Sequence, residues 1–143
     1  MPRLDPFESL GFQCGLTFRA FVAVLEGKLK GTGISRAQFL ALAHLTALGP
    51  ISQAELAERL SITAATAARL VDRMERDGWV TRRPDPQDGR ANLVTPTPQT
   101  ATAWENVSRI GRELLEEAYQ GVPPSDIETV KRILGQIRRN LGA

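Results

Sequence analysis

The segment "SQAELAERLSITAATAARLVDRMERDGWVTRRPDPQDGRANLVTPT", residues 52–97, decides the fold. It opens with a short helical pattern over Ser52–Arg59, followed by a tight turn at Leu60–Ile62 and a second helical pattern over Thr63–Asp77. Ser and Thr are favoured caps at helix N-termini, and the glycine at position 78 is typical of a helix end. Two helices joined by so short a turn predict a helix-turn-helix.

The second helix of this pair has two different faces. One is apolar at the i, i+3, i+4, i+7 spacing of a packed helix, with Ala67, Leu70, Val71 and Met74. The other carries Thr66, Arg69, Arg73 and Arg76. The small first turn around Ala65 suits a helix that enters a DNA major groove about 12 Å wide, with free N–H groups for phosphate. The alternative is that these arginines form a solvated face paired with Asp72, Glu75 and Asp77.

The runs "WVTRR" (residues 79–83) and "ANLVT" (residues 91–95) carry apolar and β-branched residues and flank seven residues rich in Pro, Asp and Gly. This pattern predicts a β-hairpin. A hairpin that follows a recognition helix is a wing, whose tip lies beside the minor groove. We expect Arg90 to enter that groove, because a narrow minor groove attracts guanidinium groups. Asp88 is placed to hold Arg90 by a charge-assisted hydrogen bond.

Four further helices are predicted around this segment from their start signals. The first runs from Pro6 to Lys30 after the cap Asp5, and the others begin at Ser35, at Thr97 before a proline, and at Ser125. The first and the last two are amphipathic, with apolar residues at spacings of three and four. Apolar faces at both ends of a small chain are most simply buried against a second copy, so we expect a homodimer; the alternative is a monomeric bundle.

The expected fold is mainly α with a small β-hairpin (α+β): a winged helix-turn-helix whose long N- and C-terminal helices form a dimerisation bundle. Within one integrated domain, residues 1–34 and 98–143 would hold the dimer and residues 35–97 would bind DNA. The chain has 143 residues and a net charge of +2. We expect no membrane segment and a cytoplasmic location, because no apolar run is long enough to span a bilayer and the N-terminus lacks a signal-peptide pattern.

Bulk charge does not favour nucleic acid, since residues 52–90 hold seven basic and seven acidic side chains. A dimeric winged helix that binds another protein is therefore the alternative function. An enzyme is not expected, because no nucleophile with a base and no metal cluster is evident. No cofactor is expected either, and His44 as the only histidine argues against a zinc site. The single cysteine, Cys14, excludes an internal disulfide and is expected to be a buried spacer; the alternative is a redox role.

The motif "LVDRMERDGWVTRRPDPQDGRA", residues 70–91, resembles the recognition-helix end and wing of the MarR family of winged helix-turn-helix regulators, including the Asp-x-Arg pair at Asp88 and Arg90. The resemblance implies a homodimer that binds a pseudo-palindromic operator on double-stranded DNA and usually represses a nearby gene. Carried onto this chain, it places base or phosphate contacts on Thr63, Thr66, Arg69 and Arg73. Two departures stand out: Gly89 replaces a basic residue common at the tip, and Pro96 is expected to end the returning strand at Thr95.

The resemblance also implies relief of repression by a small aromatic or phenolic effector. We expect its pocket between the first, second and fifth helices, bordered by Phe18, Arg19, Phe39 and Trp104. His44 would hydrogen-bond the ligand there. The alternative for His44 is a satisfied structural group on the second helix.

Overall fold

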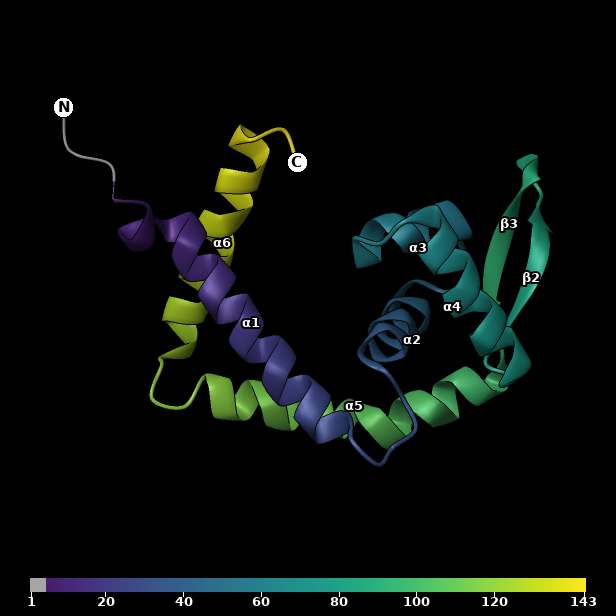
Figure 1. Cartoon of the computed structure of the whole chain (residues 1–143), viewed down its shortest axis with the longest axis horizontal. Helices are drawn as coiled ribbons and strands as arrows, with labels where there is room; N and C mark the ends of the chain where they lie inside the picture. Colours follow the sequence, from purple (N-terminus) through teal and green to yellow (C-terminus); the bar gives the residue numbers. More distant parts are fainter. Residues whose placement is uncertain (1–4) are drawn as a thin grey trace.

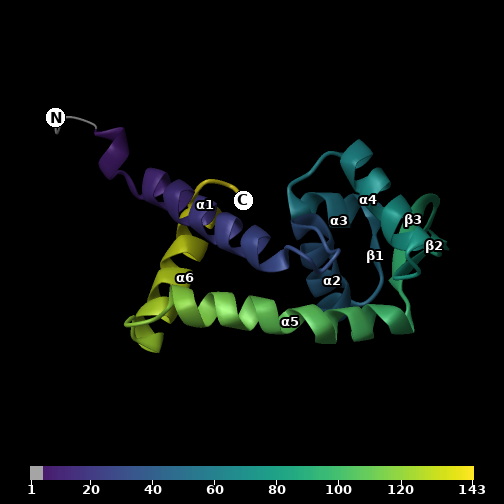
Figure 2. The same cartoon turned by 60° about the horizontal axis from the view of Figure 1, so that its bottom comes forward.

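Helix α5 runs along the whole molecule and connects two lobes (Figures 1 and 2). One lobe contains α2, α3, α4 and the hairpin, and the other contains α1 and α6 (Figure 1). The computed structural model describes residues 5–143. In chain order the elements are η1 Pro6–Glu8, α1 Leu10–Leu29, α2 Arg36–Leu48, β1 Ile51–Ser52, α3 Gln53–Leu60, α4 Ala64–Arg76, β2 Val80–Asp85, β3 Asp88–Pro96, α5 Pro98–Ala118 and α6 Pro124–Asn140.

The predicted helix-turn-helix is confirmed in α3 and α4. Ser52 Oγ accepts the Glu55 N–H at 3.0 Å at the start of α3, and Thr63 Oγ1 accepts the Thr66 N–H at 3.1 Å at the start of α4. Each cap satisfies a backbone donor that has no partner within the helix. Ser61 closes α3 in the left-handed conformation, with φ of 53°. The chain thereby turns within three residues from one helix to the next.

The wing is confirmed as an antiparallel hairpin of β2 and β3, and its strands run further toward the tip than the sequence indicated. A third strand, β1, pairs with β3 through Ile51 and Val94, giving the order β1-β3-β2. Two residues are too short to show an alternating pattern, which is why sequence reasoning missed β1. The expected end of β3 at Thr95 was wrong, since the strand includes Pro96. Because β1 stops pairing at Val94, one side of β3 is open there and tolerates a proline.

Two predicted helix starts were also wrong. The helix expected from Pro6 to Lys30 is interrupted: a single 3₁₀ turn ends at Ser9, whose extended backbone and side chain cap α1 instead. The last helix does not start with Ser125 as its cap. Pro123 is the N-cap and Pro124 the first helical residue. A residue before proline is forced into an extended conformation, and proline suits the first helical position because it has no N–H to satisfy.

The hydrophobic core lies where α2, α3, α4 and the sheet meet. Leu42, Leu56 and Met74 are fully buried there, and Val80 and Val94 bring in the hairpin. The core continues along α5, whereas α6 has no buried residue. Across residues 5–143, no helix combines the length and apolar character needed to span a bilayer.

Candidate nucleic-acid interface

The first turn of α4 carries two linked threonines and an arginine. Thr63 Oγ1 donates to Thr66 Oγ1 at 2.9 Å, and Arg69 Nη2 donates to the same oxygen at 3.3 Å. Ala65 is exposed beside them and adds no bulk. The structure therefore brings the predicted contact residues of the helix start together on one exposed turn. The hydrogen bonds hold the Arg69 guanidinium along this face of the helix.

Three arginines continue this exposed face of α4, and we call them the arginine face: Arg69, Arg73 and Arg76. Among residues 5–143, none of the three forms an ion pair. Asp72 and Glu75, two of the three acids expected to neutralise them in the alternative interpretation, pair instead with an arginine of the wing. The third, Asp77, forms no ion pair among the described residues. The arginine face is therefore available to an anionic partner such as a phosphate backbone.

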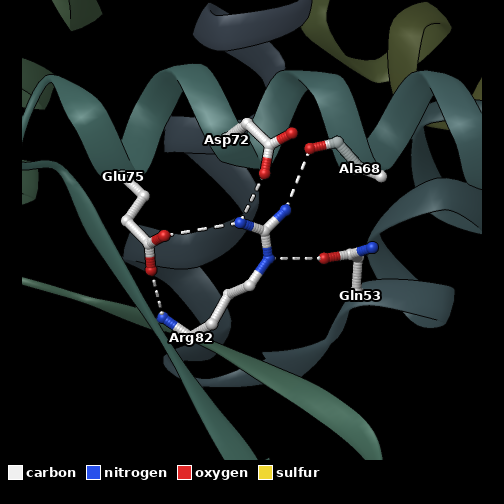
Figure 3. A network of polar contacts seen from close by, with 5 residues as sticks. All are labelled: Gln53, Ala68, Asp72, Glu75 and Arg82. Carbon is white, nitrogen blue, oxygen red and sulfur yellow. Dashed lines mark hydrogen bonds and ion pairs between the residues drawn. The ribbon is translucent and has the colours of Figure 1, made fainter.

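That wing arginine is Arg82 in β2, and Figure 3 shows its contacts. Its Nη1 lies 2.7 Å from Asp72 Oδ1 and 3.4 Å from Glu75 Oε1. Its Nε donates to Gln53 Oε1 at 3.0 Å and its Nη2 to the Ala68 carbonyl at 2.9 Å. The Arg82 backbone N–H also donates to Glu75 Oε2 at 3.0 Å. One side chain of the wing thus contacts both helices of the helix-turn-helix.

Sequence reasoning did not single out Arg82. A usable signal was present in the strand alternation: Val80 is buried, and residues two apart on a strand share a face. Position 82 therefore points toward α4, whereas Arg83 is exposed. The charge at position 82 then requires acceptors on that helix face, which are supplied by Asp72 and Glu75.

The wing tip is held by two aspartates that accept backbone hydrogen bonds. Asp85 Oδ1 accepts the Gln87 N–H at 2.9 Å, and Asp88 Oδ1 accepts the Arg90 N–H at 3.0 Å. The predicted link between Asp88 and Arg90 therefore exists, but it involves the backbone of Arg90 and not its guanidinium. The Arg90 side chain is exposed and has no ion pair within the described part of the chain. Its charged group is consequently free to extend from the tip.

Two threonines, the half-buried Thr97 and the buried Thr100, connect the base of the wing to α5. Thr97 Oγ1 donates to the Gly78 carbonyl at 2.7 Å, and Thr100 Oγ1 donates to the Trp79 carbonyl. Thr100 Oγ1 also accepts the Thr97 N–H at 3.1 Å, and the Thr100 residue is only 2% exposed. The end of the recognition helix is thereby joined directly to the helix that leads to the other lobe.

A cavity of about 450 Å³ lies between α1, α2 and α5. Of the residues expected to border an effector pocket, Phe18, Phe39 and Trp104 line it, and the last two rings lie 5.3 Å apart. Arg19 and His44 are not among its lining residues. The cavity therefore joins the aromatic part of the predicted set but not its polar part. Cys14, expected to be buried, is half-buried on α1.

Comparisons with known proteins agree with this geometry. The model of the MarR family matches residues 32–91. The multiple antibiotic resistance protein MarR of Salmonella typhimurium is 30% identical over 115 residues, which cover 80% of each chain. An uncharacterised HTH-type transcriptional regulator of Bacillus subtilis, YybA, is 26% identical over 129 residues, covering 90% of this chain and 86% of that protein.

Solved structures show the same fold. Wild-type MarR of Escherichia coli in its apo form superposes with a TM-score of 0.76 at 27% identity, covering 90% of this chain and 96% of that chain. A mutant of that protein complexed with operator DNA gives a TM-score of 0.78 at 27% identity, covering 94% of this chain and 99% of the other. The fold is thus shared along nearly the whole length of the chain. The chain belongs to the MarR family of transcriptional regulators.

Proposed function

We propose that the protein represses transcription as a homodimer bound to a pseudo-palindromic operator. The observation that supports this most directly is that, among residues 5–143, neither the arginine face of α4 nor the exposed Arg90 at the wing tip forms an ion pair. Thr63, Ala65 and Thr66 would enter the major groove with the start of α4, Arg69 would contact bases or phosphates, and Arg73 would contact the backbone. The related MarR mutant complexed with operator DNA supports this mode. Such a regulator acts where chromosomal DNA lies, in the cytoplasm.

A second copy would cover the apolar surface of the lobe formed by α1 and α6. Val130 and Ile133 on α6 are 51% and 42% exposed, and Phe7 at the N-terminal end is 66% exposed. Large exposed side chains gathered on terminal helices mark a surface that is buried in an assembly. In this proposal residues 1–34 and 98–143 hold the dimer, and residues 35–97 bind DNA. The two recognition helices would then enter half-sites about 34 Å apart.

We further propose that a small aromatic effector binds in the cavity between α1, α2 and α5. Phe39 and Trp104 offer aromatic faces, and the basic residues Arg36 and Arg112 are among those that line the cavity. An effector can weaken operator binding only by its difference in affinity for the two forms of the dimer, typically about 1 to 3 kcal/mol. Titration with 4-hydroxybenzoate, followed by tryptophan fluorescence, should show quenching that Trp104→Phe abolishes and Trp79→Phe preserves.

The operator is tested by selection from a random duplex library at near-physiological salt, with sequencing of the retained DNA. Recovery of a two-fold symmetric motif with half-sites about one helical turn apart is the expected result. Affinity for that motif should fall steeply with salt, because each neutralised phosphate releases counterions. Recovery of no motif by the folded, ligand-free dimer would contradict operator binding and favour the protein-binding alternative.

A further inference from the structure

We infer that Arg82 is a positioning residue for DNA binding: it fixes the angle of the wing against the recognition helix and neutralises two carboxylates beside the arginine face. This inference rests on the proposed operator contact of the wing tip. Arg82 itself is not a contact residue. Its side chain is only 19% exposed, and its Nε, Nη1 and Nη2 atoms are all engaged by protein acceptors.

The first part of the inference follows from where the contacts of Arg82 lie. Its acceptors belong to two helices: Gln53 in α3, and Ala68, Asp72 and Glu75 in α4. A planar guanidinium with several fixed acceptors allows little rotation, unlike a single ion pair. The hairpin is therefore tied to the two helices at one defined position along β2.

Beyond Arg82 the wing has no such tie. Among the described residues 83–90, the side-chain hydrogen bonds are those of Asp85 and Asp88, and both stay within the tip. The strands continue outward as a two-stranded ribbon, because β1 pairs with β3 only at positions 93 and 94. An isolated two-stranded ribbon is marginally stable and readily twists. The location of Arg90 relative to α4 therefore depends on the anchor at Arg82.

The second part concerns charge. Asp72 and Glu75 lie on α4 among the arginines and remain partly exposed, with 61% and 45% of their side chains accessible. Without Arg82, two negative charges would face the phosphates that the arginine face is to bind. Repulsion between these carboxylates and the phosphates would weaken binding to DNA of any sequence. The loss of the wing anchor, in contrast, would weaken only the contacts that the wing tip makes. The two effects can therefore be separated by measurement.

The experiment is a double-mutant cycle of Arg82→Met and Arg90→Ala in the full-length dimer, with binding to the selected duplex measured by fluorescence anisotropy. In the native background Arg90→Ala should weaken binding about tenfold to a hundredfold. In the Arg82→Met background the same change should weaken binding less than about threefold, because the tip no longer sits in the groove. Arg83→Met is the matched control, since it removes one charge from an exposed neighbour on the same strand. In its background Arg90→Ala should keep its full effect.

Equal losses from Arg90→Ala in the native and Arg82→Met backgrounds would overturn the inference while leaving the operator contact intact. No loss from Arg90→Ala in the native protein would overturn both. Circular dichroism establishes that each variant is folded at the assay temperature. Should Arg82→Met fail to fold, Glu75→Ala takes its place, because it removes both carboxylate oxygens, one of which accepts the Arg82 N–H and the other Nη1. It should likewise reduce the loss from Arg90→Ala, and an unreduced loss would overturn the inference.

A DNA-free measurement provides a second test. Amide hydrogen exchange in the wing reports whether the hairpin is held, independently of any duplex. Arg82→Lys keeps the positive charge but lacks the planar guanidinium group. Its non-specific binding to a scrambled duplex should therefore stay near that of the native protein. Hydrogen exchange of the residue 82 amide should still be faster than in the native protein. Native exchange at that amide in both Arg82→Lys and Arg82→Met would overturn the anchoring part of the inference.

Discussion

Replacement of Thr100 by valine tests whether the polar junction between the wing and α5 contributes to stability. Valine is close to threonine in size and branching, so the substitution creates no cavity, but it replaces the hydroxyl with a methyl group. What disappears is the hydroxyl, which donates to the Trp79 carbonyl and accepts the Thr97 N–H. The perturbation is therefore confined to two hydrogen bonds at a residue that is 2% exposed.

The structure limits the size of the effect. The Thr97 N–H also donates to the Trp79 carbonyl at 3.1 Å, and the Thr97 hydroxyl donates to the same oxygen at 3.2 Å. The Trp79 carbonyl and the Thr97 N–H therefore each keep a hydrogen-bond partner when the Thr100 hydroxyl is removed. The full free-energy cost of an unsatisfied buried polar group does not apply. Two hydrogen bonds at about 0.5 to 1.5 kcal/mol each give an expected loss of about 1 to 3 kcal/mol, nearer the lower end because partners remain.

Urea denaturation followed by circular dichroism measures this loss at one fixed protein concentration, because the stability of a dimer depends on concentration. Thr102→Val is the control, since Thr102 lies on the same helix but is exposed. It should change the free energy of unfolding by less than about 0.5 kcal/mol. If Thr100→Val cost no more than Thr102→Val, the junction would contribute nothing and the reasoning would be refuted. A loss above about 4 kcal/mol would also refute it, because it would require an orphaned buried group.

Three further predictions concern the helix cap, the arginine face and the cavity. Thr63→Ala removes the acceptor of the Thr66 N–H and should lower the free energy of unfolding by about 1 kcal/mol in urea denaturation; an unchanged midpoint would contradict the cap. Arg73→Ala should weaken binding to all duplexes similarly and reduce the slope of log affinity against log salt by about 1 in anisotropy titrations; loss confined to one sequence would instead indicate a base contact. Gly111→Ala places a Cβ 3.1 Å from Phe39 Cζ, so it should displace that ring. The affinity for 4-hydroxybenzoate, measured by fluorescence titration, should then fall. An unchanged affinity would contradict binding of the ligand in this cavity.

Local signals determined most of the DNA-binding lobe. The caps at Ser52 and Thr63, the apolar stripe of α4 and the glycine at position 78 act over one or two helical turns, so they can be read without the rest of the chain. The same signals failed where neighbouring start signals compete. Ser125 carries a capping pattern, but the conformation fixed by the two preceding prolines starts α6 earlier. Ser9 interrupts the predicted first helix for a similar local reason.

Only the tertiary structure decided which charges remain free. The sequence places acids and arginines close together along α4, and either set of pairs is compatible with helical spacing. Folding of the hairpin against α4 brings Arg82 onto Asp72 and Glu75, and this contact between two different elements leaves the arginine face without its acidic partners. The cavity likewise forms only where α5 packs against α1 and α2, from which it is distant in the chain, so the sequence indicated its aromatic residues but misplaced Arg19 and His44. Secondary structure depends on nearby residues, whereas pairing of charges and enclosure of space depend on which segments meet.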